Sequence, residues 1–148
     1  MRFSSKSEYG VRVLVSLGRR YGQGPVPLSE IARAERMPLP YLEQIMGTLR
    51  RAGLVVSRQG KKGGFELARP PSEVRMSEVV LGLEGGIAPM LCAVGERAGR
   101  VLCELEGSCT SQVLWRRIRD SILTVLETTT LDELIPPALG EAGARMAR

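Results

Sequence analysis

The chain has 148 residues, a length that suits one domain or two small ones, and it carries 21 lysines and arginines against 16 aspartates and glutamates. No stretch approaches the roughly eighteen uninterrupted apolar residues of a membrane span, which excludes a membrane-spanning protein. The first residues lack the apolar segment of a secretory signal, so we expect a cytoplasmic protein whose thiols stay reduced.

The positive charge is concentrated in the first half of the chain. Residues 1–75 carry fourteen basic against six acidic residues, a balance of +8, and residues 76–148 carry seven against ten, a balance of −3, which together give the total of +5. A basic half joined to a mildly acidic half is typical of a DNA-binding module followed by a dimerisation or sensing module. Charge alone leaves open a protein that is simply basic throughout.

The first half contains the pattern of a helix-turn-helix. Ser5 and Glu8 have the spacing of a capping box, which predicts the start of a first helix. A second, short helix is predicted to start at residues 27–30. The prolines in residues 37–40 predict a turn, because proline disfavours helix in the residue before it. A third helix is predicted over residues 40–52, and helix, short turn and helix together form a helix-turn-helix.

A predicted β-hairpin follows the third helix directly. Residues 54–57 and 64–67 have the composition of short strands. Between them, residues 58–63 form a cationic, glycine-rich tip whose glycines allow turn geometry and whose lysines can neutralise a phosphate. A basic hairpin in this position turns the helix-turn-helix into a winged helix.

The second half contains one long amphipathic helix. A shorter helix is predicted over residues 76–83, and the long one from Cys109 onward. Its apolar residues at steps of three and four form one face: Leu114, Ile118, Ile122 and Val125. Little chain remains to cover this face, so we expect it to pack against the same helix of a second subunit, with packing on its own domain as the alternative. The expected fold class is mainly α with a small β-hairpin wing: a winged helix-turn-helix DNA-binding domain plus a long dimerisation helix.

The cysteines lie close together in the second half. Cys92, Cys103 and Cys109 are the only three in the chain, and there is no histidine. A structural zinc site usually takes four such ligands, whereas an iron–sulfur cluster could borrow a fourth ligand from elsewhere. Three unrelated thiols remain the alternative on spacing alone.

The order of these parts resembles that in the Rrf2 family of bacterial transcription regulators, in particular in its iron–sulfur members of the IscR and NsrR type. The resemblance covers roughly residues 1–135 and is most specific in a few stretches: residues 25–28, 41–44, 49–55, 63–65, and Cys109 followed by Leu114 and Trp115. It implies a homodimer that binds a double-stranded DNA operator and whose cluster state changes its DNA affinity or sequence preference. The domains expected from it are residues 1–75 for DNA binding, 76–135 for the cluster-binding loop and dimerisation helix, and 136–148 as a flexible tail.

The resemblance also implies a ligand set. It comprises Cys92, Cys103 and Cys109, although the ten residues between the first two exceed the usual interval. IscR-type members place a histidine ligand where this chain has Gln112, and relatives without it use a carboxylate near the start of the first helix, which here is Glu8. We favour Glu8 as the fourth ligand, and the alternative is that it serves only as the acidic partner in a capping box. A 2Fe-2S cluster is expected over a 4Fe-4S one. The alternative is a cluster-free regulator of the same fold that senses by thiol oxidation or through a protein partner.

Base contacts are expected at the start of the third helix. Gln44 suits an adenine edge, Glu43 can accept a hydrogen bond from a cytosine amino group, and Pro40 and Tyr41 suit backbone or shape contacts. For Glu43 an exposed surface charge is the alternative. Further DNA contacts are expected from helix and wing: Arg50, Arg58, Gln59, Lys61 and Lys62. We expect no enzyme, because the chain has no histidine base and no nucleophile or phosphate-binding motif.

Overall fold

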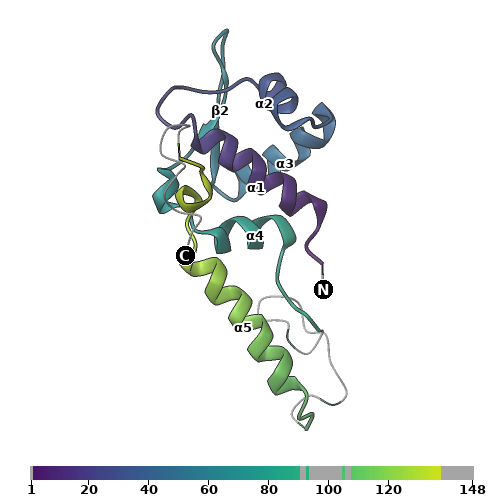
Figure 1. Ribbon diagram of the computed structural model, residues 1–148. Helices are drawn as coiled ribbons and strands as arrows, with labels where there is room; N and C mark the ends of the chain where they lie inside the picture. Colours follow the sequence, from purple (N-terminus) through teal and green to yellow (C-terminus); the bar gives the residue numbers. More distant parts are fainter. Residues whose placement is uncertain (1, 91–92, 94–104, 106–107, 138–148) are drawn as a thin grey trace.

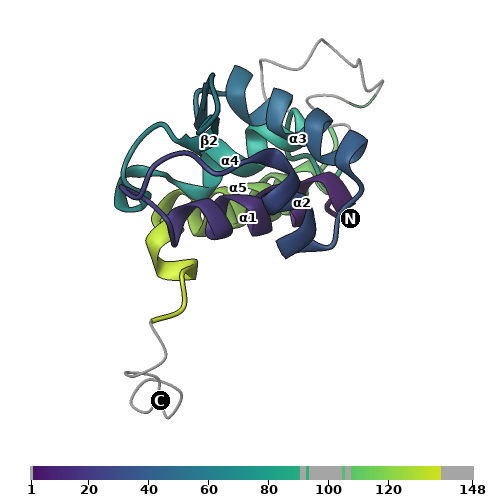
Figure 2. The ribbon, with the colours of Figure 1, turned by 90° about the horizontal axis from the view of Figure 1, so that it is seen from above.

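A computed structural model of the chain describes residues 2–90, 93, 105 and 108–137. In chain order its elements are α1 (Ser5–Gly18), α2 (Leu28–Glu35), α3 (Leu39–Arg51), β1 (Val55–Arg58), β2 (Gly64–Leu67), η1 (Pro71–Glu73), α4 (Met76–Glu84), α5 (Gln112–Thr128) and η3 (Leu131–Leu134). In Figure 1, α4 lies between α1 and α5, and α5 extends away from the other helices. Seen from above, α1, α2 and α3 cover α4 and α5 (Figure 2).

Helix α1 starts one residue earlier than its capping pattern predicts. Ser4, not Ser5, is the N-cap: it has an extended backbone, and its Oγ accepts a hydrogen bond from the Ser7 amide at 3.4 Å. Glu8 therefore lies one position beyond the third helical residue that a capping box requires. The prediction that Glu8 completes a capping box with Ser5 is wrong.

Helices α2 and α3 form the predicted helix-turn-helix. Arg36 closes α2 in the left-handed conformation with φ of 52°, and Pro38 then precedes the first turn of α3. Because apolar residues recur along one face of α3, that face lies in the core. Leu42, Ile45 and Leu49 are each 0% exposed. The opposite face of α3 is left to solvent.

The hairpin pairs β1 with β2 antiparallel, with Val55 opposite Leu67 and Arg58 opposite Gly64. Val26, just before α2, extends the sheet through a bridge to Phe65, in which each backbone N–H donates to the other's carbonyl at 2.8 Å. This bridge requires a glycine at Gly64, since a Cβ there would lie 2.2 Å from the Val26 carbonyl oxygen. The sheet contact thus ties the wing to the start of α2.

Helix α4 belongs to the same hydrophobic core as the helix-turn-helix. Val79 is fully buried, and a Cβ on Gly10 of α1 would lie 2.5 Å from the Leu83 Cδ1, so the two helices meet closely. On the other side of the core, Leu131 of η3 is fully buried and its N–H donates to the Val74 carbonyl. The chain beyond α5 therefore returns to the core formed by the first half.

Helix α5 begins at Gln112 and not at Cys109, because residues 109–111 form a turn before it. Of its residues only Gln112 is buried. Leu114 is 53% exposed and Val125 63% exposed, while Ile118 and Ile122 are half-buried. Within the part of the chain that the structure describes, no helix combines the length and apolarity needed to cross a membrane.

Candidate nucleic-acid interface and cysteine segment

The first two turns of α3 present a polar outer face. Pro40, Glu43 and Gln44 are exposed there, as is Arg50 in the last turn. Between the described residues the carboxylate of Glu43 has no ion pair. These side chains are thus brought together on one surface, as their spacing predicts, and are free to meet a ligand such as a base edge.

Tyr41 has a different environment from its neighbours on α3. It is half-buried, its hydroxyl lies 3.3 Å from the Ser5 Oγ, and its ring meets that of Tyr9 edge to face with centroids 5.7 Å apart. Both partners belong to α1. Tyr41 therefore holds the start of α3 on α1, which leaves only part of its surface for a DNA contact.

The tip of the wing is exposed and cationic. Gln59, Lys61 and Lys62 are exposed, and no ion pair engages either lysine among the described residues. Arg58 differs, because its Nε lies 2.8 Å from the Glu66 Oε1 on the paired strand. Two lysines with free charges are suited to phosphates, whereas the charge of Arg58 is already partly compensated.

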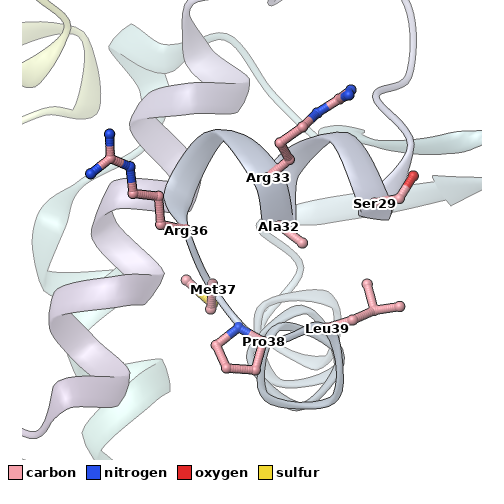
Figure 3. A pocket seen from close by; sticks show the side chains of 7 residues that line it. All are labelled: Ser29, Ala32, Arg33, Arg36, Met37, Pro38 and Leu39. Atoms are coloured by element: carbon pink, nitrogen blue, oxygen red, sulfur yellow. The ribbon is translucent and has the colours of Figure 1, made fainter.

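A shallow pocket lies at the turn between α2 and α3 (Figure 3). It is lined by Ser29, Ala32, Arg33, Arg36, Met37, Pro38 and Leu39. Arg33 and Arg36 are exposed, and in Figure 3 their side chains point away from each other and outward from α2. Sequence reasoning missed these two arginines as candidate phosphate contacts. Their place on the polar face of α2 was the signal that could have found them.

Cys109 is the only predicted cysteine ligand within the described residues; Cys92 and Cys103 lie outside them. The Cys109 Sγ lies 2.9 Å from the Ser111 Oγ in the turn that precedes α5. The side-chain hydrogen bond with Ser111, followed by backbone N–H groups of Ser111 and Gln112, lowers the pKa of the Cys109 thiol. A thiolate is the form that binds metals and reacts with oxidants.

Glu8 is exposed on α1, and its carboxylate makes no hydrogen bond or ion pair with the described residues. In Figure 1 the start of α1, beside the N-terminus, and the start of α5, at the end of that helix away from the core, lie in different parts of the subunit. In the described part of the chain, no three Cys, His, Asp or Glu side chains gather as a metal site would need. Gln112, which the resemblance places where IscR-type regulators have a histidine, is buried.

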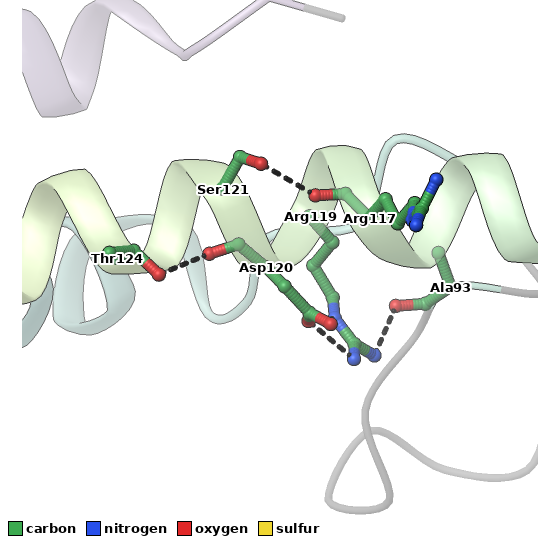
Figure 4. A network of polar contacts seen from close by, with 6 residues as sticks. All are labelled: Ala93, Arg117, Arg119, Asp120, Ser121 and Thr124. Atoms are coloured by element: carbon green, nitrogen blue, oxygen red, sulfur yellow. Dashed lines mark hydrogen bonds and ion pairs between the residues drawn. The ribbon is translucent and has the colours of Figure 1, made fainter.

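Arg119 of α5 reaches into the segment between α4 and α5. Its Nη1 donates to the Ala93 carbonyl at 3.0 Å, and its Nε and Nη2 donate to the Asp120 Oδ1 at 2.9 and 2.7 Å (Figure 4). Ala93 is 0% exposed and directly follows Cys92 in the chain. This contact fixes one point of the cysteine segment on α5, and sequence patterns carried no signal for it.

The helix-turn-helix, the paired wing and the exposed cationic surface define a winged-helix DNA-binding protein. A family model for Rrf2, an iron-dependent transcriptional regulator, matches residues 3–137. The chain is 34% identical over 146 residues to the HTH-type transcriptional regulator CymR of Bacillus subtilis, covering 99% of this chain and 98% of that one. It is 33% identical to the regulator IscR of Pectobacterium atrosepticum, covering 91% and 79%.

Solved structures of CymR proteins also match this chain. The structure of B. subtilis CymR, described as a global cysteine regulator, matches with a TM-score of 0.70 at 34% identity, covering 90% of this chain and 95% of that one. The oxidised form of Staphylococcus aureus CymR matches with a TM-score of 0.72 at 34% identity, covering 93% and 98%. The protein belongs to the Rrf2 family and is a DNA-binding transcription regulator. The expected family and the winged-helix fold class are confirmed.

Proposed function

We propose that the protein binds a near-palindromic operator as a homodimer and senses redox, iron–sulfur status or nitric oxide through an iron–sulfur cluster. The observation that carries this proposal is the exposed apolar face of α5, which begins just beyond Cys109. A dimerisation helix that starts three residues beyond a sensing cysteine can pass a chemical change at that cysteine to the spacing of two DNA-binding domains.

The exposure of α5 supports the homodimer. Leu114 and Val125 are each more than half exposed, and both lie on the face that also carries Ile118 and Ile122. A contiguous apolar face of this length is unfavourable in water, and a second copy of the same helix covers it symmetrically. Two subunits joined in this way present two α3 helices to two half-sites of one operator.

The residues present fit a cluster in their donor chemistry. Cys92, Cys103 and Cys109 would supply thiolates, and the lowered pKa of Cys109 favours its ligating form. Glu8 has no capping role and no partner among the described residues, so its carboxylate is available as an exchangeable oxygen ligand. Since α1 and the start of α5 are separated within one subunit, the Glu8 ligand would come from the second subunit. Of the two cluster types, we favour 2Fe-2S.

When bound, a cluster with one oxygen-ligated iron supplies a centre open to oxidants or nitric oxide. This chain's own residues would then hold it across the two subunits, with Cys109 in the turn before α5 and Glu8 on α1. Because α1 also packs on α3, a change in this ligation is transmitted to the DNA-binding surface.

A second function is favoured by the relatives. B. subtilis CymR is described as a global cysteine regulator, and S. aureus CymR has been solved in an oxidised form. Each matches this chain at 34% identity. In this version the three cysteines carry no cluster, and oxidation of the Cys109 thiolate or docking of a protein partner changes DNA affinity.

The experiment that separates the two functions is anaerobic purification followed by visible absorption and iron and sulfide analysis. A coloured protein with iron and acid-labile sulfide supports the cluster. Loss of the colour, iron and sulfide in Cys109→Ala would support that cysteine as a ligand. Glu8→Ala is expected to keep a labile cluster with an altered spectrum. A colourless protein whose operator binding changes on mild oxidation supports thiol sensing instead.

A further inference from the structure

Glu84, the last residue of α4, accepts three hydrogen bonds from the start of α1. The Ser4 backbone N–H donates to its Oε1 at 2.7 Å, the Ser4 Oγ at 2.8 Å and the Ser7 Oγ at 2.5 Å. Hydrogen bonds to a carboxylate are stronger than those between neutral groups. A single carboxylate therefore holds the N-cap and the first turn of α1, 80 residues away in the chain.

The surroundings of Glu84 make this contact well defined. Ser7 is 4% exposed, and one turn further along α1 the close approach of Gly10 to Leu83 brings the same two helices together. Beyond Glu84 the helix ends, since Gly85 takes a left-handed φ of 79°. The chain then enters the segment that carries the cysteines. Glu84 thus lies between that segment and α1.

The same turn of α1 also contacts α3, the helix that we expect to read DNA bases and call the recognition helix. The Ser5 Oγ lies 3.3 Å from the Tyr41 hydroxyl, and the ring of Tyr9 packs edge to face on Tyr41. Tyr41 is in the first turn of α3, next to the exposed Glu43 and Gln44. One turn of α1 consequently bonds to the end of α4 and to the start of α3.

We propose that Glu84 is a positioning residue for DNA recognition: by holding the first turn of α1, it fixes Tyr41 and with it the start of α3. It touches no base or phosphate itself. The inference rests on the proposed function only in taking the segment after Glu84 as the sensor. Under it, a movement of that segment that pulls Glu84 from Ser4 and Ser7 loosens the recognition helix.

Amide hydrogen exchange of the full-length chain without DNA tests this proposal directly. In Glu84→Ala, exchange is expected to rise about tenfold at the amides of Ser7 and Glu8 and also at those of Tyr41 and Leu42, a factor that corresponds to about 1.4 kcal/mol. Glu78→Gln is the matched control, because it removes another α4 carboxylate, which pairs with Arg69 outside this contact chain. A rise confined to α1 and α4, with α3 unchanged, overturns the proposal.

Operator affinity provides the second measurement. Glu84→Ala and Tyr41→Phe are each expected to weaken binding several-fold, with the double variant little weaker than either, because both break one chain of contacts. Fully additive losses overturn the coupling. If Glu84→Ala does not fold by circular dichroism, Ser7→Ala removes one of its hydrogen bonds and takes its place. If the wild type binds no operator, the proposed function fails, while the exchange experiment still decides the role of Glu84.

Discussion

Arg119 on α5 and Ala93, 26 residues earlier, are joined by a hydrogen bond of 3.0 Å from a guanidinium to a buried backbone carbonyl. Asp120 orients the guanidinium from the other side (Figure 4). The side chain of Arg119 is only 22% exposed, so the bond is shielded from solvent. A fixed point next to Cys92 thus depends on the helix that we propose as the dimer contact.

Arg119→Ala is expected to make Cys92 more accessible, because the carbonyl of Ala93 loses its charged donor and the backbone there is freed. The measurement is the alkylation rate of each cysteine in the reduced protein, followed by peptide mass spectrometry, with a rise of several-fold at Cys92. Arg117→Ala, an exposed arginine on the same helix, is the control and should leave that rate unchanged. Equal Cys92 alkylation rates in the two variants would show that the hydrogen bond from Arg119 to the Ala93 carbonyl does not affect the accessibility of Cys92.

A double substitution on α5, Leu114→Asp with Val125→Asp, should yield a folded monomer. Both side chains are largely exposed in one subunit, so the two aspartates should not unfold it. In a dimer the new charges would be buried, at a cost of several kcal/mol. Sedimentation measures the mass, and operator binding should be lost with the dimer. Arg116→Asp on the opposite side of the helix is the control. If the double variant stays dimeric, the dimer interface does not involve this face of α5.

Replacing Lys61 and Lys62 by alanine should weaken binding to all DNA sequences alike. Each lost phosphate contact reduces the salt dependence of the binding constant by about 0.9 in log–log slope. Arg58→Ala should reduce it less, because that charge is already paired with Glu66. The measurement is the DNA-binding constant at several salt concentrations, on operator and on unrelated duplexes. An unchanged log–log salt slope in the double variant would show that the wing lysines do not contact DNA.

The stability of the protein should fall in acid through Glu84. Burial raises the pKa of this carboxyl, but hydrogen bonds from Ser7 and then Ser4, together with the charge of Lys6, outweigh it and lower the pKa below 4.5. A depressed folded-state pKa contributes stability above the unfolded value that is lost as pH falls through the folded value. Denaturant unfolding from pH 7 to 3 should therefore show the wild type more stable than Glu84→Gln at pH 7, with the difference shrinking as pH falls below the unfolded carboxyl value and through the lower folded one. A constant difference would contradict this.

The sequence by itself determined the helix-turn-helix and the wing, because their signals are local. Apolar residues such as Leu42, Ile45 and Leu49 recur at helical spacing, and the glycines of the wing tip lie between two short strand patterns. The exposed side chains of Glu43 and Gln44 also follow from that spacing, since one buried face leaves the other to solvent.

Only the tertiary structure decided which residue caps α1, what holds Tyr41 and where Arg119 is anchored. Ser4 rather than Ser5 becomes the cap where Glu84, far along the chain, accepts its hydrogen bonds. These contacts join groups of residues that are 26 to 80 positions apart in the chain, and each involves at least one side chain. Local propensity and periodicity describe the backbone over a few turns, but a hydrogen bond between distant side chains depends on how the helices pack, and packing is a property of the whole core.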